Sequence, residues 1–251
     1  MIPYLHLGPL LIPTFGLMVA LALITAAYIL QDDFDRRGFK ADAFTMITAA
    51  GLAGIAGAKL YHLLESPSEF FADPIGLIFT RYGFAWFGGF LGGFGTMVVL
   101  GRKAKLPIRE FLDACSPAAC FGYAIGRIGC LLSGDGDYGK PTSLPWGMRF
   151  PNGIVPTIER VHPAPLYEFF IWCILGIVLW KLGSKVTTGQ KTNGEIFALY
   201  LILTGIARFL VEIIRINPAW ILGMSNAQVV SILSLIVGVI LFFRWRTPAR
   251  P

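Results

Sequence analysis

Long apolar stretches constrain this chain more than any other feature. Of its 251 residues 55% are hydrophobic and 14% are charged, whereas a soluble domain carries about 25% charged residues. A membrane-spanning helix needs roughly 20 mainly apolar residues. Seven stretches approach that length: Thr14–Leu30, Ala43–Leu64, Phe84–Leu100, Phe111–Leu132, Pro165–Leu182, Glu195–Ile214 and Ala227–Phe243. The sequence predicts an all-α polytopic membrane protein with about seven transmembrane helices, and a single transmembrane domain over residues 1–251.

The basic residues between these stretches predict an orientation. Thirteen Lys and Arg follow the first, third, fifth and seventh stretches, whereas five lie in the loops of the opposite side. Because cytoplasmic loops carry an excess of Lys and Arg, we expect a periplasmic N-terminus and a cytoplasmic C-terminus. Residues 133–163 then form a periplasmic loop. The net charge of +6 is accounted for by these loops, so nucleic acid is not an expected partner.

Three cations, Lys59, Arg127 and Arg208, lie inside the apolar stretches, each near the predicted outer end. Ionisable residues within a membrane are costly and usually mark a functional site. Glu212 and Arg215 follow Arg208 by four and seven residues, which puts the three on one helical face. The alternative to a shared functional site is that each cation extends separately to the membrane interface.

Polar segments with many glycines surround Arg127. Gly126–Cys130 is followed by Gly134–Gly139, and His162–Glu168 then opens the next apolar stretch. This layout favours a membrane enzyme that handles an anion. The Asp135–Asp137 step is similar to the start of a calcium loop, but the other calcium ligands of that motif are missing. We therefore expect no metal.

Three motifs, in this order, resemble the signature of the prolipoprotein diacylglyceryl transferase family. That family typically reads Gly-Arg-Ile/Leu-Gly-Asn and then Gly-Glu, followed by His-Pro-x-x-Leu-Tyr-Glu and by Arg-Phe-x-x-Glu-x-x-Arg. The similar segments here are Gly126–Gly129 with Gly134–Asp135, His162–Glu168 and Arg208–Arg215. Phe15–Met18 is similar to the Tyr-Gly-Leu-Met of the family's first helix, and Trp86–Gly89 falls at its Phe-His-Gly-Gly segment.

The resemblance implies a transferase of bacterial lipoprotein maturation. Such an enzyme moves diacylglyceryl from phosphatidylglycerol to the lipobox cysteine thiol of a preprolipoprotein and uses neither metal nor cofactor. The implied partners are phosphatidylglycerol, the signal peptides of preprolipoproteins and membrane lipid. The implied location is the bacterial inner (cytoplasmic) membrane, crossed several times.

Several residues depart from the family pattern. Phe87 replaces the family's histidine, Cys130 its asparagine, Phe15 a tyrosine and Lys59 an arginine, while Asp135 replaces a glutamate on a shorter arm. Phenylalanine rings can neither carry a proton nor donate a conventional hydrogen bond. Either those groups are dispensable for catalysis, or the chain is a divergent member with altered activity.

The reaction implied by the resemblance assigns catalytic roles. Displacing a phosphate monoester needs a cationic pocket, and arginine binds two phosphate oxygens at once where lysine offers a point charge. Arg127 and Arg208 are the predicted catalytic cations. A free cysteine has a pKa near 8.5 and is only slightly ionised at neutral pH, so a base is expected. The candidates are His162, Asp135 and Asp137.

The remaining predicted site residues bind or orient the substrate. Glu212 and Glu168 are expected to hold neighbouring arginines, and Tyr167 either contacts the lipid or anchors the helix at the interface. The full substrate-binding set is Lys59, Arg127, Gly129, Gly134, Asp137, Tyr167, Glu168, Glu212 and Arg215.

Two other functions compete with the transferase. A noncatalytic or altered-specificity relative would bind phospholipid or lipoprotein precursors, and the departures at Phe15, Phe87 and Cys130 favour it. A lipid or anion transporter would also place arginines in the membrane. Transporters commonly contain internal repeats with broken helices in matching positions, and the sequence shows no such repeat.

Overall fold

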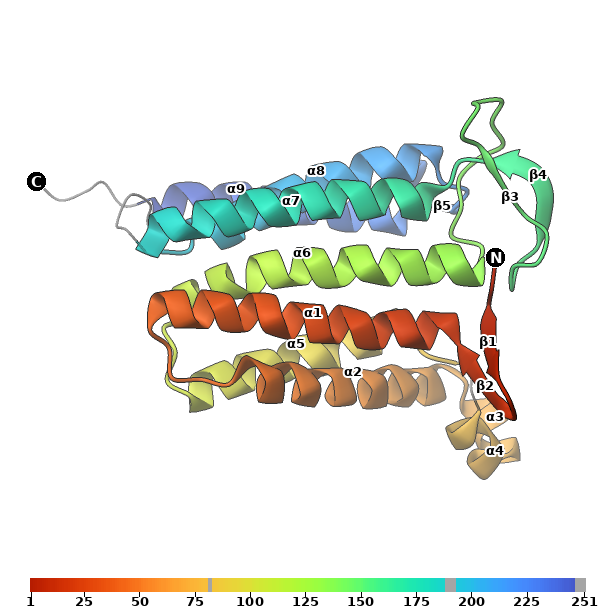
Figure 1. Ribbon diagram of the computed structural model, residues 1–251, viewed down its shortest axis with the longest axis horizontal. Coiled ribbons are helices and arrows are strands. Elements are labelled where there is room, and N and C mark those ends of the chain that lie inside the picture. The colour runs from red at the N-terminus through yellow and green to blue at the C-terminus, as the bar shows by residue number, and fades with distance from the viewer. Residues whose placement is uncertain (81–82, 188–192, 247–251) are drawn as a thin grey trace, which may run out of the picture. The chain divides into compact units, whose positions relative to one another are not determined.

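The computed structural model describes residues 1–80, 83–187 and 193–246 (Figure 1). The loop cations Arg81, Lys191 and Arg250, which enter the orientation prediction, lie outside these residues. The chain divides into two compact units. The first consists of Met1–Gly38 and Arg109–Pro251, and the second of Phe39–Ile108.

Five long helices make up the first unit within the described residues. They are α1 (Thr14–Arg37), α6 (Ile108–Ser133), α7 (Ala164–Thr187), α8 (Glu195–Ile214) and α9 (Asn226–Trp245). Figure 1 shows α7, α8 and α9 running alongside one another. At Gly205 a Cβ atom would lie 2.9 Å from the carbonyl oxygen of Ser231, so the small residue allows α8 to approach α9 closely.

Polar side chains fix the helix ends in this unit. Asp113 of α6 is fully buried and accepts hydrogen bonds from the backbone nitrogens of Gly194 (2.7 Å) and Phe197 (2.8 Å) at the start of α8. These groups have no partner within their own helix, so the carboxylate caps α8 from a neighbouring helix. Ser225 and Gln228 form a capping box at the start of α9.

Two long helices and two short ones form the described part of the second unit. They are α2 (Ala43–Glu65), α3 (Pro67–Ala72), α4 (Pro74–Phe79) and α5 (Trp86–Lys103). A Cβ atom on Gly57 of α2 or on Gly88 of α5 would collide with the backbone of the other residue. The glycines of the third apolar stretch therefore serve helix packing at Gly88 and Gly92, whereas Gly95 has open space beside it.

In the residues that the structure describes, three two-stranded antiparallel hairpins lie outside the long helices, and the predicted all-α class did not include them. They pair β1 (Tyr4–Leu7) with β2 (Leu10–Pro13), β3 (Met148–Phe150) with β4 (Thr157–Val161), and β5 (Ala219–Ile221) with β6 (Met224–Ser225). β3, β5 and β6 have only two or three residues, fewer than the four to eight over which alternation of polar and apolar residues reveals a strand in a sequence.

Six helices in the described part of the chain are long and apolar enough to cross a membrane: α1, α2, α6, α7, α8 and α9. A mostly helical, multi-pass membrane protein is thereby confirmed. The third predicted stretch corresponds to α5, which is 18 residues long, carries Arg102 and Lys103 in its last turn and is not among these six. Pro117 lies inside α6 without ending it, and α1 continues to Arg37 beyond the predicted Leu30.

Candidate active site

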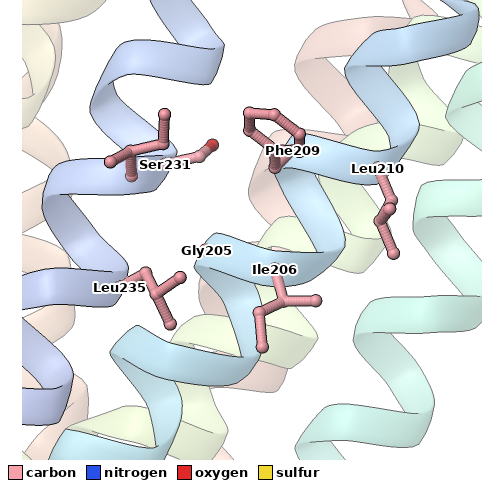
Figure 2. A pocket seen from close by; sticks show the side chains of 7 residues that line it. Gly205, Ile206, Phe209, Leu210, Ser231 and Leu235 are labelled. Atoms are coloured by element: carbon pink, nitrogen blue, oxygen red, sulfur yellow. The ribbon is translucent and has the colours of Figure 1, made fainter.

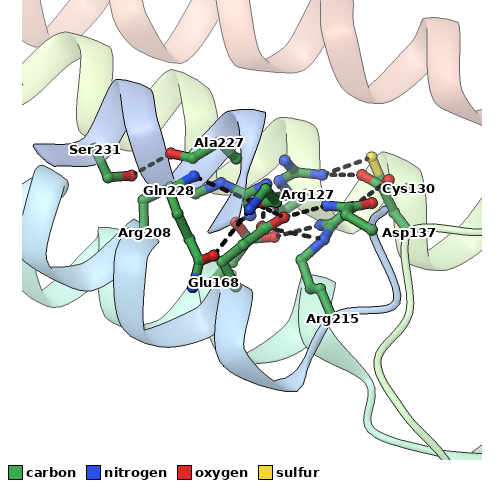
Figure 3. Close-up of polar contacts among 12 residues, drawn as sticks. Arg127, Cys130, Asp137, Glu168, Arg208, Arg215, Ala227, Gln228 and Ser231 are labelled. Carbon is green, nitrogen blue, oxygen red and sulfur yellow. Dashed lines mark hydrogen bonds and ion pairs between the residues drawn. The ribbon is translucent and has the colours of Figure 1, made fainter. Parts of the chain in front are cut away.

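An ion-pair network joins three arginines to three carboxylates in the first unit (Figure 3). Its members come from α6, from the loop after α6, from the first turns of α7, from the last two turns of α8 and from the residue that caps α8. They are Arg127, Asp137, Glu168, Arg208, Glu212 and Arg215. We call this group the arginine–carboxylate network. Its formal charge is zero if every member is ionised.

Glu168 is the centre of the network. Its side chain is fully buried, and its two oxygens lie 3.1 Å from Arg127 Nε, 2.7 Å from Arg208 Nη1 and 3.4 Å from Arg215 Nη1. A buried charge needs such partners because its desolvation is otherwise unfavourable. The expectation that Glu168 holds a neighbouring arginine is confirmed.

Glu212 fixes the C-terminal part of α8. One oxygen lies 2.8 Å from Arg208 Nη2, one turn earlier on the same helix. The other accepts hydrogen bonds from Ser225 Oγ at 2.8 Å and from Asn217 Nδ2 at 2.5 Å. The ion pair with Arg208 confirms the contact that was expected between these two residues of one helix. Ser225 and Asn217 were not predicted as parts of the site.

Asp137 bridges two arginines from a loop. Its Oδ2 atom accepts a hydrogen bond from Arg127 Nη1, and its Oδ1 atom lies 2.5 Å from Arg215 Nη2. Burial by itself would raise the pKa of Asp137, but the two arginines lower this pKa below its ordinary value. Asp137 is therefore ionised at neutral pH.

Tyr123 links two members of the network and was missed from the sequence. Its hydroxyl accepts a hydrogen bond from Arg127 Nη2 at 2.8 Å and donates one to Glu168 Oε1 at 2.7 Å. Its ring centroid lies 4.8 Å from Arg127 Cζ and 4.6 Å from that of Trp172. The spacing of four residues between Tyr123 and Arg127 is the signal that could have indicated this contact.

Backbone hydrogen bonds hold the loop after α6 against the ends of α7 and α8. The Gly139 nitrogen donates to the His162 carbonyl at 2.8 Å, and the Lys140 nitrogen donates to the Ile214 carbonyl at 2.7 Å. Gly134 has a φ of +59°, and a Cβ atom there would lie 2.6 Å from Gly153 Cα. A left-handed backbone in so tight a contact requires glycine. The loop thereby brings Asp137 to Arg127 and Arg215.

The two acids of this loop occupy different electrostatic environments. Burial, and then the neighbouring Asp137 carboxylate, raise the pKa of Asp135 above its ordinary value. The pKa of Asp137 is shifted in the opposite direction. Environments that separate two carboxyl pKa values suit one group to proton transfer and the other to a permanent charge.

His162 and Tyr167 form a separate pair. His162 Nδ1 lies 3.2 Å from the Tyr167 hydroxyl, which also accepts a hydrogen bond from Trp146 Nε1 at 2.8 Å. Among the described residues, neither side chain forms a hydrogen bond or ion pair with the arginine–carboxylate network. The role of His162 as a base stays a prediction.

Other predicted residues lie elsewhere. Gly129 packs against α1, where a Cβ atom would come within 3.2 Å of Met18 Cβ. Lys59 belongs to the second unit, donates a hydrogen bond to the Thr80 carbonyl at 3.2 Å and lies 5.1 Å from the Phe84 ring centroid. Phe87 also belongs to this unit. The predicted role of Lys59 at the phosphate stays a prediction.

Cys130, Asp135 and Asp137 place one ligand atom each within 4.8 Å of one another, as a metal site would. A cation is already present there, because Arg127 Nη1 donates to Asp137 and lies 3.5 Å from Cys130 Sγ. This arrangement does not favour a metal ion. The four cysteines are free thiols.

An apolar pocket lies between α8 and α9 (Figure 2). Its lining residues are Gly205, Ile206, Phe209, Leu210, Ser231, Ile232 and Leu235. The cavity volume of about 110 Å³ is well below the roughly 300–1,000 Å³ of pockets that enclose small-molecule ligands. We assign it no ligand.

Comparison with known proteins identifies the family of this chain. The sequence model described as prolipoprotein diacylglyceryl transferase matches residues 3–244. A phosphatidylglycerol–prolipoprotein diacylglyceryl transferase of Clostridium tetani (strain Massachusetts / E88) is 30% identical over 91% of this chain and 91% of its own length. One of Halalkalibacterium halodurans is 31% identical over 97% of this chain and 85% of its own length. The chain belongs to the prolipoprotein diacylglyceryl transferase family.

Proposed function

We propose that this protein transfers diacylglyceryl from phosphatidylglycerol to the lipobox cysteine thiol of preprolipoproteins in the bacterial inner membrane. The observation that carries the proposal is the arginine–carboxylate network in a chain of this family. Three arginines near one carboxylate supply planar, bidentate donors of the kind that bind phosphate oxygens.

The reaction exchanges one bond on a glycerol carbon. The substrate thiolate attacks the carbon that carries the phosphate ester, a carbon–sulfur bond forms and the carbon–oxygen bond to phosphate breaks. Glycerol 1-phosphate leaves with the electron pair, and the thiol proton passes to a base. Arg127, Arg208 and Arg215 stabilise the negative charge that gathers on the leaving phosphate.

Asp135 is the proposed base, and His162 is the alternative. The raised pKa of Asp135 suits proton transfer, and its loop neighbour Asp137 contacts Arg127 directly. His162 is held by Tyr167 instead. We further propose that Glu168 and Glu212 orient the arginines. Lys59, Gly129, Gly134 and Tyr167 are assigned to substrate binding.

Direct transfer is the experiment that tests the activity. Purified protein, incubated in detergent with phosphatidylglycerol and a peptide that carries a lipobox cysteine, is expected to add the mass of one diacylglyceryl group to the peptide. The same peptide with serine in place of cysteine should gain no mass, since its hydroxyl is far less acidic. If no adduct forms while the Halalkalibacterium halodurans relative modifies the peptide in parallel, the proposed activity is wrong.

We also propose a seven-span topology, with α5 as the additional span, a periplasmic N-terminus and a cytoplasmic C-terminus. The excess of basic residues on one side supports it. Ser143 and Lys40 are both exposed in loops, on opposite predicted sides. A membrane-impermeant thiol reagent applied to intact cells should label Ser143→Cys and leave Lys40→Cys unlabelled until the cells are lysed. The protein with its native cysteines alone supplies the background. Labelling of Lys40→Cys in intact cells would reverse the topology.

A further inference from the structure

The arginine–carboxylate network carries no excess positive charge that could bind a phosphate. Arg127, Arg208 and Arg215 face Asp137, Glu168 and Glu212, and every arginine contacts at least two of these carboxylates. An added phosphate would leave an excess negative charge among side chains that are largely shielded from water, which is strongly unfavourable. Binding of an anion therefore requires one carboxylate to leave its arginines.

Two of the three carboxylates are fixed in place. The Glu168 side chain is fully buried on α7 and holds three arginines and Tyr123. The Glu212 side chain is 1% exposed on α8, where Ser225 and Asn217 hold it together with Arg208. Moving either carboxylate would break its contacts with several partners at once.

Asp137 differs from both in position and exposure. Its side chain is 35% exposed, so an anion from outside reaches it first, whereas the side chain of Arg215 behind it is 5% exposed. It lies in a loop rather than a helix, between Gly136 with a φ of +95° and Tyr138. Its two oxygens bind two different arginines, which is the bridging arrangement that two phosphate oxygens would adopt.

We propose that Asp137 is an internal anion that occupies the phosphate site between Arg127 and Arg215 and is displaced by the phosphate group of the substrate. The inference rests on the proposed function for the identity of the substrate. It gives the acidic loop a role in turnover, because the return of Asp137 to its arginines helps to expel the glycerol phosphate product. The ligand expected between these two arginines is a phosphate ester with a small polar substituent.

Binding of glycerol 1-phosphate to the purified protein tests the displacement without any transfer. Asp137→Asn removes the competing charge and keeps the side-chain shape. We expect this variant to bind glycerol 1-phosphate about tenfold more tightly than the unchanged protein by isothermal titration calorimetry. Asp137→Glu keeps the competing charge and is expected to bind it no more tightly than the unchanged protein. Glu159→Gln removes an exposed negative charge from β4 and should change the affinity less than about twofold, since exposed charges are screened.

Three more ligands test which chemical group the site binds. Inorganic phosphate in place of glycerol 1-phosphate should show the same preference for Asp137→Asn, whereas glycerol should bind none of the variants. Phosphatidylglycerol in mixed micelles should also bind Asp137→Asn more tightly than the unchanged protein if the lipid headgroup occupies this site. Equal or weaker binding of both soluble phosphates by Asp137→Asn would overturn the proposal. Tighter binding by Asp137→Asn, together with no transfer to a lipobox peptide by the unchanged protein, would support the displacement and refute the proposed function.

A measurement on the unchanged protein covers the case in which Asp137→Asn does not fold. Glycerol 1-phosphate is expected to speed amide hydrogen exchange in residues 134–138, because Asp137 leaves its arginines and the loop opens locally. Exchange in β4 serves as the reference. Unchanged or slower exchange in the loop at saturating ligand would contradict the displacement.

Discussion

Arg127→Lys is expected to lower turnover at subsaturating phosphatidylglycerol at least about tenfold. Arg127 uses three nitrogens on Asp137, Glu168 and Tyr123 at the same time, and an ammonium group cannot reproduce this planar geometry. Loss of one partner from a buried charged hydrogen bond costs roughly 2–5 kcal/mol, and each 1.4 kcal/mol corresponds to about a factor of ten. Arg208→Lys should behave similarly, because Arg208 binds Glu168 and Glu212 through separate nitrogens.

Initial rates of lipobox-peptide modification over a range of lipid concentrations measure this effect. Arg160→Lys is the matched control, because Arg160 is an exposed arginine on β4. This variant should modify the peptide at the rate of the unchanged protein. If Arg127→Lys and Arg208→Lys both keep that rate and the same lipid dependence, the bidentate phosphate site is wrong. The arginines would then be interface anchors, and the catalytic assignment would move to Asp135 and Asp137.

Glu168→Gln is expected to lower the free energy of unfolding by roughly 3–5 kcal/mol, the range found when one partner of a buried ion pair is removed. The fully buried carboxylate faces three arginines, and the neutral amide leaves their repulsion uncompensated. The unfolding temperature in a fixed detergent, followed by circular dichroism, should fall by several degrees. Since the same arginines are proposed to bind phosphate, transfer should fall as well.

Glu159→Gln makes the same chemical change on an exposed strand and should leave the unfolding temperature nearly unchanged. Tyr123→Phe removes only the hydroxyl between Arg127 and Glu168, so its effect should be smaller than that of Glu168→Gln. An unfolding temperature for Glu168→Gln equal to that of the unchanged protein would show that this carboxylate does not hold the network together.

The sequence by itself determined the long helices and the part of the network that lies within one helix. Apolar length predicts spanning segments because the hydrocarbon core of the membrane has a fixed thickness, and six of the predicted stretches are helices that meet this requirement. Arg208 and Glu212 were predicted as partners from their spacing along one helix, and the structure confirms their ion pair. Local geometry is sufficient for such contacts.

The tertiary structure alone decided which residues meet across elements. Arg127, Glu168 and Arg215 are separated by 41 and 47 residues along the chain, and packing of α6, α7 and α8 brings them together. The pairing of Asp137 with Arg127 and Arg215 depends on loop hydrogen bonds to α8 and to His162. The same packing leaves His162 beside Tyr167, outside the network. A sequence records which charges a chain carries, but the position of each buried charge depends on partners that only the folded chain supplies.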